Sequence, residues 1–206
     1  TYTANKEISE DSTIESGEYS STTSNENAII STGDVDVNLS NITVDKTGDS
    51  DGGDSSNFYG NNSAILAKNG ANLTIKNATI TTEADGANGV FSYGGSATTN
   101  NSSSDGTTNA SNLTINTSGT SSAAIRSDRG GGTVKVNGGT YTTTGNGSPS
   151  IYSTADITVN DATLVAKASE GIVIEGASTV TINNCDLKDS NTKLNGQSTT
   201  YKNIFL

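Results

Sequence analysis

Apolar residues in this chain fall in short bursts in which every second residue is apolar, and no stretch of a dozen residues shows a helical spacing. The bursts are rich in Val, Ile and Thr, and they are separated by Gly, Asn, Asp and Ser. An alternation with a period of two is typical of β-strands that bury one face. The pattern therefore predicts an all-β chain.

One phrase recurs along the chain, and a short apolar strand precedes most of its copies. The copies are VDVNLSNITV (35–44), LTIKNATITT (73–82), LTINTSGT (113–120), VKVNGGTYTT (134–143), ITVNDATLVA (157–166) and VTINNCDLKD (180–189), with a weaker one from Thr13. The preceding strands are AIIST (28–32), AILAK (64–68), GVFSY (89–93), AIRSD (124–128), SIYST (150–154) and GIVIE (171–175). A single turn of this kind cannot bury its own apolar side, whereas turns stacked ~4.8 Å apart can. We expect a single-domain right-handed parallel β-helix, a solenoid of about six to seven turns with three short strands in each.

The alternation also predicts which side chains point into the solenoid. In the middle strand, the expected inward pairs are Val35/Val37, Leu73/Ile75, Leu113/Ile115, Val134/Val136, Ile157/Val159 and Val180/Ile182. In the third strand, the expected inward residues are Tyr19, Ile42, Ile80, Thr120, Tyr141, Leu164 and Leu187. A tight corner between these strands is predicted at the small residues Gly17, Ser40, Ala78, Ser118, Gly139, Ala162 and Cys185.

The polar pair in each copy marks a turn. Its first member is expected to form an Asn ladder along the helix axis, made of Asn38, Asn116, Asn137, Asn160 and Asn183. Its second member is expected to adopt a left-handed backbone, which suits Asn77, Gly138, Asp161 and Asn184.

One β-helix domain is expected to span residues 1–206. Residues 1–12 and 191–206 are its N-terminal and C-terminal edge segments, and two loop insertions at 48–63 and 94–111 interrupt the repeat. Because neither end offers an amphipathic helix as a cap, we expect a segment of a longer solenoid whose partners include adjoining β-helix turns.

On residues 10–190 the repeat looks like the pectate-lyase-like right-handed β-helix superfamily. In character it is closest to the Thr/Asn/Gly-rich β-helix segments of bacterial surface and adhesin-like proteins. The resemblance implies a secreted or cell-surface bacterial protein that acts as a rigid spacer or an adhesion surface. It specifies function poorly, because one solenoid fold supports many activities.

The composition of the chain excludes several classes of function. Among 206 residues there is no His and one Cys, and the net charge is −11. The absence of His excludes a Ser-His-Asp triad and an imidazole zinc site. The acidic charge argues against nucleic acid as a partner, and no apolar segment is long enough for membrane insertion.

Candidate binding residues lie on the outward face of the first strand of each turn. One outward row is Ile30, Leu66, Phe91, Arg126, Tyr152 and Val173, and the neighbouring row is Thr32, Lys68, Tyr93, Asp128, Thr154 and Glu175. Three interpretations stay open. The insertions fold back over this face, with Phe58 and Tyr59 sealing a satellite core. Alternatively, the face is a groove for a polysaccharide, with Phe91, Tyr93 and Tyr152 as stacking platforms and Lys68, Arg126 and Asp128 as polar anchors. In the third, it binds a host or neighbour-cell surface protein.

Catalysis and metal binding have weaker signals. Polysaccharide lyases of the superfamily use stacked acidic residues to hold calcium, and the row here offers only Asp128 beside Arg126. A glycoside hydrolase needs two carboxyl groups roughly 5–9.5 Å apart, and Asp128 and Glu175 lie two turns, about 10 Å, apart. We therefore expect no enzyme, with a lyase or hydrolase as the alternative, and no cofactor apart from a possible calcium ion.

The calcium ligands would be Asp49, Asp51 and Asp54 in DSDGGD, where two glycines let the backbone curl. Gly60 stands where an EF-hand loop has its Glu, so an acidic solvated loop is favoured.

Overall fold

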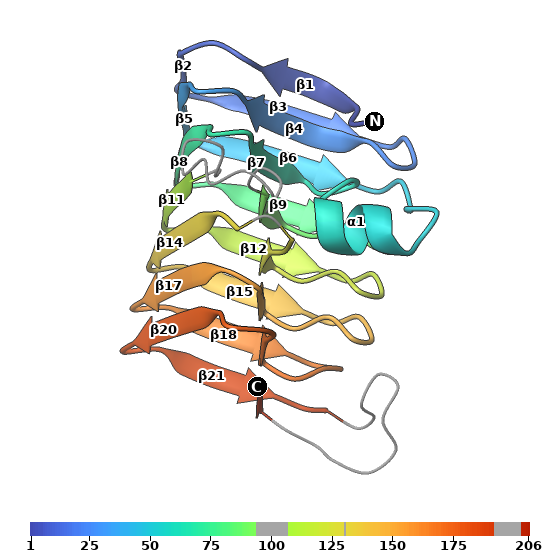
Figure 1. The fold of residues 1–206 in the computed structure, drawn as a ribbon, viewed down its shortest axis with the longest axis vertical. Helices are drawn as coiled ribbons and strands as arrows, with labels where there is room; N and C mark the ends of the chain where they lie inside the picture. Colours follow the sequence, from blue (N-terminus) through green and yellow to red (C-terminus); the bar gives the residue numbers. More distant parts are fainter. Residues whose placement is uncertain (94–106, 130, 192–202) are drawn as a thin grey trace.

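Short strands follow one another along the chain and stack in one column from the N-terminus to the C-terminus (Figure 1). The computed structural model describes residues 1–93, 107–129, 131–191 and 203–206. Successive strands enter three different parallel sheets in turn, so that neighbours within a sheet are every third strand of the chain. The protein is a single-domain parallel β-helix of about seven turns, as its repeat predicts.

We name the three sheets A, B and C in the order in which the chain enters them. Sheet A contains β1 (Ala4–Ile8), β4 (Asn27–Thr32), β7 (Ile65–Lys68), β10 (Val90–Tyr93), β13 (Ile125–Ser127), β16 (Ile151–Ser153), β19 (Ile172–Ile174) and β22 (Ile204–Phe205). Sheet B contains β2 (Ser12–Ile14), β5 (Asp36–Ser40), β8 (Asn72–Lys76), β11 (Thr107–Ser111), β14 (Thr133–Asn137), β17 (Asp156–Asn160) and β20 (Thr179–Asn183). Sheet C contains β3 (Gly17–Ser21), β6 (Ile42–Lys46), β9 (Thr79–Thr82), β12 (Thr114–Thr117), β15 (Thr140–Thr143), β18 (Thr163–Ala166) and β21 (Asp186–Asp189).

The core fills the space between the sheets as straight rows of apolar side chains. One row of sheet C runs through Tyr19, Val44, Ile80, Ile115, Tyr141, Leu164 and Leu187. In sheet B the inward pairs predicted at 73/75, 134/136, 157/159 and 180/182 are in register with one another. The predicted inward rows are therefore confirmed in these turns, although Ile182 in β20 is 37% exposed.

The prediction for the third copy of the repeat is wrong, because residues 113–120 do not provide a strand of sheet B. Ile115 pairs with Ile80 and Tyr141 in sheet C, and Thr120 lies beyond β12. The sheet B strand is instead β11, so the second insertion ends before residue 107, and residues 94–106 lie outside the described residues. Apolar alternation does not predict this strand, because its inward residues are Thr108 and Ala110. The Thr108 hydroxyl is hydrogen-bonded to the Ser92 hydroxyl at 2.9 Å.

The first copy is shifted by two residues from its predicted register. Val37 and Leu39, rather than Val35 and Val37, align with Leu73 and Ile75, and in sheet C Val44 replaces Ile42. Val35, Val37 and Leu39 alternate without a break, so the pattern permits both registers. The turn before Asp36, where β5 begins, decides between them.

The corner between sheets B and C is not reserved for small residues. Ile42 and Leu113, rather than Ser40 and Ser118, align with Ala78, Gly139, Ala162 and Cys185. Each large residue lies beside a glycine in the adjacent turn. A Cβ atom on Gly139 would come within 2.3 Å of the Leu113 carbonyl oxygen, so the two corners fit only because Gly139 has no side chain.

The turn after sheet B contains two ladders. In the first, Asn160 donates to Asn137 at 2.9 Å and Asn183 to Asn160 at 2.7 Å, which confirms the Asn ladder for the last three turns. Asn38 and Asn116 lie elsewhere, opposite threonines, so their inclusion is wrong. In the second ladder, the predicted left-handed backbone is confirmed at Asn77, Gly138, Asp161 and Asn184, and Asn41 and Asn112 share it.

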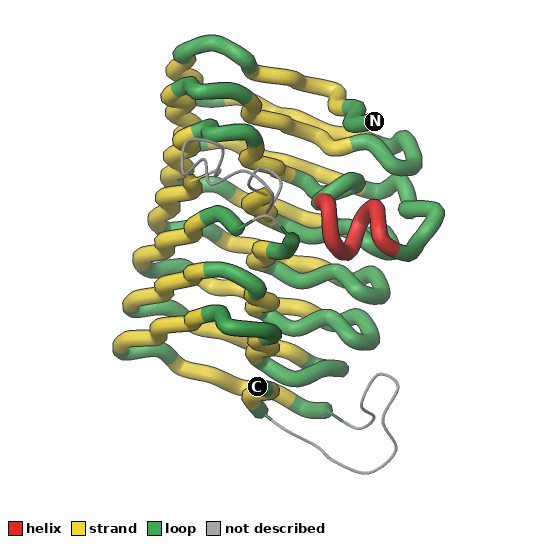
Figure 2. Tube along the Cα trace, viewed as in Figure 1, coloured by secondary structure: helices red, strands yellow, loops and turns green. Residues whose placement is uncertain are grey.

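The two insertions and the ends complete the fold. The insertion at 48–63 contains α1 (Asp54–Tyr59), red in Figure 2, which lies on the side of the column. In the edge segments, β1 pairs with β4 and β22 pairs with β19, so both segments add strands to sheet A. The described residues contain no helix with the length and apolarity needed to cross a membrane.

Candidate functional site

The outward face of sheet A is arranged as the sequence predicts. Ile30, Leu66, Phe91, Arg126, Tyr152 and Val173 form one continuous row, which Phe205 extends at the C-terminal end. The side chains between them, such as Ser92, Ser127 and Ser153, point into the solenoid and are buried. The N-terminal half of this row is covered by other parts of the chain, whereas the C-terminal half is open. The covering therefore decides which half is accessible to a ligand.

The N-terminal half is covered by the first insertion and is closed to ligands. Ile30, Leu66 and Phe91 are buried in an apolar cluster of their own, outside the main core. Gly60, at the end of α1, lies directly on this cluster, since a Cβ atom there would be 2.8 Å from Leu66 Cδ1. The expectation that the first insertion folds back over the face is confirmed for this half.

Tyrosines, rather than Phe58, complete the cover. The Tyr93 ring lies 6.4 Å from the Tyr2 ring and 5.7 Å from the Tyr59 ring, and the Tyr2 hydroxyl donates to the Tyr59 carbonyl oxygen at 2.7 Å. Lys68 Nζ lies 4.4 Å from the centre of the Tyr2 ring. Burial lowers the pKa of Lys68 and raises that of Tyr93. Two of the predicted ligand residues, Lys68 and Tyr93, therefore belong to a packed aromatic cluster.

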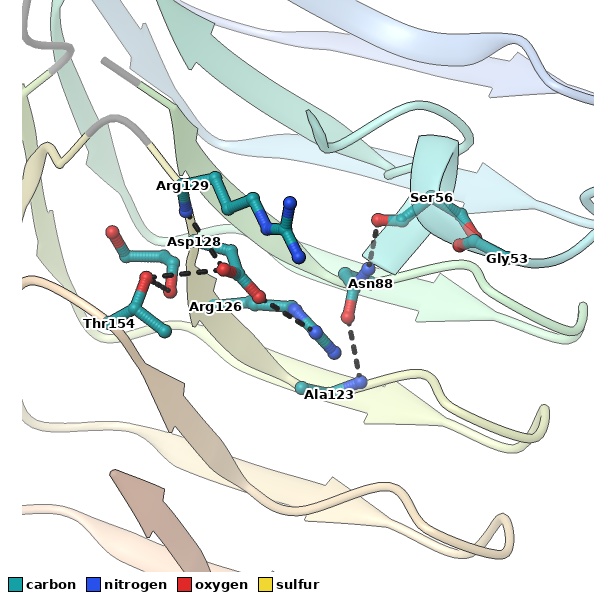
Figure 3. Close-up of polar contacts among 9 residues, drawn as sticks. Gly53, Ser56, Asn88, Ala123, Arg126, Asp128, Arg129 and Thr154 are labelled. Carbon is teal, nitrogen blue, oxygen red and sulfur yellow. Dashed lines mark hydrogen bonds and ion pairs between the residues drawn. The ribbon is translucent and has the colours of Figure 1, made fainter. Parts of the chain in front are cut away.

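The helix is held on the column by buried amide side chains. In Figure 3, Asn88 lies between α1 and the next turn, donating to the Ser56 carbonyl oxygen at 3.5 Å and accepting from the Ala123 N–H at 3.0 Å. Asn62 donates to the Gly48 carbonyl oxygen at 2.8 Å. These contacts make α1 a fixed wall beside the open half of the face.

Arg126, Asp128 and Tyr152, three other predicted ligand residues, are brought together. Arg126 Nη2 is 3.1 Å from Asp128 Oδ2, and the Arg126 guanidinium carbon is 3.9 Å from the centre of the Tyr152 ring. Asp128 Oδ1 also accepts from the Arg129 N–H at 2.8 Å and the Thr154 hydroxyl at 3.2 Å (Figure 3). Burial lowers the pKa of Arg126 and raises that of Asp128, while each partner opposes the shift of the other. The ion pair is buried, so loss of one partner would leave an uncompensated charge.

A cavity of about 280 Å³ opens over the C-terminal half of the row. Its floor consists of Arg126, Tyr152, Val173 and Phe205 from successive strands of sheet A. The rest of the lining comes from connections between sheets C and A: Asn57 and Phe58 of α1, and Ser121, Gly147, Pro149, Ser169 and Glu170 of the later loops. Glu175 lies at its edge; burial, together with a hydrogen bond to Glu175, raises the pKa of the Tyr152 hydroxyl.

Several of these lining residues are absent from the candidates that the sequence suggests. Asn57 and Glu170 lie outside the strands, and Phe205 follows the last repeat, so period-two alternation does not single them out. One signal was present: Glu170 occupies the repeat position that Pro149, Ala123 and Asn88 hold in the preceding turns. A charge at a repeat position that is uncharged in the other turns is the feature to search for.

The acidic insertion has structural partners for its carboxylates. Asp49 Oδ1 accepts from the Asp85 N–H at 2.9 Å, and Asp51 Oδ2 accepts from Asn25 Nδ2 at 2.7 Å. Asp54 begins α1. Across the part of the chain that the structure describes, no three His, Cys, Asp or Glu side chains gather closely enough to hold a metal ion.

Comparison of the chain with protein-family models, with curated proteins and with solved structures found no match. The function therefore has to be argued from the fold and from this cavity.

Proposed function

We propose that the chain is a non-catalytic module of a secreted or cell-surface bacterial protein, in which a rigid β-helix holds an adhesion surface away from its attachment point. The proposal places the fold with the right-handed β-helices of the pectate-lyase-like superfamily. Its main support is the unbroken pairing of strands through all three sheets, because such a ladder transmits position along the axis with little bending.

Catalysis by Asp128, the carboxyl group that the sequence singles out beside Arg126, is disfavoured by the hydrogen bonds that it accepts; the carboxyl groups that do line the cavity are those of Glu170 and Glu175. Asp128 accepts hydrogen bonds from Arg126, Arg129 and Thr154, and it does not line the cavity. A general acid or base has to lie within hydrogen-bond reach of the reacting proton. A carboxyl group that is enclosed by its own scaffold lacks that reach.

A second candidate function is carbohydrate binding at the cavity. The supporting observation is a concave site that combines aromatic surfaces, Phe58 and Tyr152, with polar groups at its walls. Sugar-binding sites need both, because a sugar ring has apolar C–H faces and polar edges. A protein on a host or neighbouring cell is the remaining partner for the same face.

Native electrophoresis through gels that contain plant, microbial or host polysaccharides tests these functions. We expect at least one polymer to retard the protein without being shortened, and Tyr152→Ala to abolish the retardation because Tyr152 is part of the cavity floor. Lys188→Ala, on the exposed face of sheet C, is the matched control; relative to its own mobility in a gel without polysaccharide, it should be retarded as much as wild type. Uniform mobility in every gel would contradict the carbohydrate-binding function and leave the spacer function as the proposal. Cleavage of any polymer would overturn the non-catalytic proposal.

A further inference from the structure

Two polar atoms in the cavity residues are buried and have no hydrogen-bond partner. They are Nε of Arg126, a donor, and Oδ1 of Asn57, an acceptor. Arg126 is 5% exposed, so its unpaired N–H is withdrawn from bulk water. An unsatisfied buried polar group is costly, about 1–3 kcal/mol, and a ligand recovers that cost where a turn of the side chain presents the group to it.

The pairing of one unsatisfied donor with one unsatisfied acceptor selects the chemistry of the ligand. A carboxylate only accepts hydrogen bonds and an ammonium group only donates them. A hydroxyl does both, so a ligand with several hydroxyl groups offers a partner to a donor such as Arg126 Nε and to an acceptor such as Asn57 Oδ1.

The charge around the cavity is negative, which further restricts the ligand. Glu170, which is 9% exposed, and Glu175 line it, while the charge of Arg126 is offset by Asp128. Arg129 is a further cation near the cavity, with its guanidinium carbon 3.9 Å from the Phe58 ring centre. Together, these five described side chains have a net charge of −1. An anionic sugar would face two carboxylates, whereas a neutral sugar meets two hydrogen-bond acceptors and an amino sugar two counter-charges.

The apolar surfaces and the volume of the cavity limit the size of the ligand. The rings of Phe58, Tyr152 and Phe205 line the cavity, and an arginine stacks on one face of Phe58 and of Tyr152, so the C–H groups of a sugar would pack against the remaining face or edge of these two rings. The volume of about 280 Å³ is close to the lower end of the ~300–1,000 Å³ usual for small-molecule sites. That space accommodates one sugar unit.

We propose that this cavity binds a single neutral or amino-sugar unit of a glycan and rejects uronic acids. The inference rests on the carbohydrate-binding function proposed above and adds the class of sugar. It also separates this site from one that would hold an acidic, pectin-like chain.

Calorimetric titration with three probes tests the sugar class: a neutral hexose disaccharide, a glucosamine disaccharide and a galacturonate disaccharide. Wild-type protein should bind one or both of the first two at least tenfold more tightly than the third. Asn57→Leu removes the acceptor at similar side-chain size and should weaken that binding about tenfold. Glu175→Gln, at an exposed position, should narrow the discrimination against galacturonate. Lys188→Ala should bind as wild type does.

The outcomes separate the inference from the function on which it rests. Galacturonate binding as tight as that of the other two probes would overturn the sugar class while leaving carbohydrate binding intact. Binding unchanged by both Asn57→Leu and Glu175→Gln would place the sugar elsewhere and overturn the inference. Absence of binding by all three probes, together with unretarded migration in polysaccharide gels, would overturn both. If Asn57→Leu fails to fold, the galacturonate discrimination of Glu175→Gln still decides the proposal.

Discussion

At the position of Lys46, the residue type that the fold requires differs from one turn of the solenoid to the next. Lys46 occupies the inward row of sheet C where the next three turns have Thr82, Thr117 and Thr143. Each of those threonines donates to a loop carbonyl five residues ahead. Lys46 is fully buried and donates to the carbonyl oxygens of Thr23 and Gly48 at 3.0 and 2.6 Å. Gly48 begins the insertion after β6 and Thr23 belongs to the loop between β3 and β4, so the longer side chain of Lys46 joins two loops where each threonine bonds only its own.

This burial makes stability depend on pH. Burial lowers the pKa of Lys46 from its ordinary value of 10.5 to about 8, although Glu26 and Asp49 oppose the shift. Between pH 8 and 10.5 the unfolded chain binds more protons at this lysine than the folded chain, so the contribution of Lys46 to the free energy of unfolding should rise with pH. Denaturant titrations of wild type and Lys46→Thr at several pH values measure this contribution to the free energy of unfolding.

The difference between the two proteins isolates Lys46 from other groups. Burial raises the pKa of Tyr2, Tyr141 and Tyr152, so the folded state keeps protons that the unfolded state loses, and both proteins should lose stability above about pH 10. We expect the stability of wild type relative to Lys46→Thr to increase from pH 8 to pH 10. Parallel pH profiles would contradict the lowered pKa.

At the scale of the element, alternation predicts a strand well where both the buried and the exposed rows are distinct. β17 satisfies this condition, because the buried Ile157 and Val159 alternate with the more exposed Asp156, Thr158 and Asn160. β11 does not, since its buried residues are Thr108 and Ala110. A strand in a stack inherits its pairing from the turns on either side, so a weak sequence can still be held in register.

The register of β17 can be tested with two neighbouring substitutions. Val159→Asp places an unpaired charge in the core and should lower the free energy of unfolding by roughly 3–5 kcal/mol, or the melting temperature by about 10 °C or more. Thr158→Asp points outward beside Lys135 and should change stability by less than about 0.5 kcal/mol. Thermal unfolding followed by circular dichroism compares them, and equal destabilisation would refute the register.

At the scale of the whole molecule, the three ladders make the column a rod of defined length. Ser20 and Lys188 lie in one outward row of sheet C, joined through Asp45, Thr81, Asn116, Thr142 and Val165. Six strand steps of ~4.8 Å place their backbones about 29 Å apart. A spacer requires that this separation be constant.

Spin labels on Ser20→Cys and Lys188→Cys measure that separation by pulsed electron resonance. The native thiol is removed by Cys185→Ala, which introduces the residue that Ala162 provides one turn earlier. We expect one narrow distance distribution near 29 Å, widened by the label linkers, because every intervening turn is paired on both sides. Singly labelled proteins control for contacts between molecules. A broad or two-peaked distribution would contradict a rigid spacer.

The sequence by itself determined the class of fold, the number of turns and most of the core, because these depend on alternation and repetition within one chain segment. It also placed Arg126, Asp128 and Tyr152 on one face, since strands in a regular stack keep residues of equal repeat position in line. The tertiary structure alone decided that α1 buries Phe91, that Lys68 and Tyr93 pack with Tyr2 and that the open cavity lies beyond the helix. These features depend on where an insertion without repeats returns to the column. Such long-range packing leaves no periodic trace in the sequence.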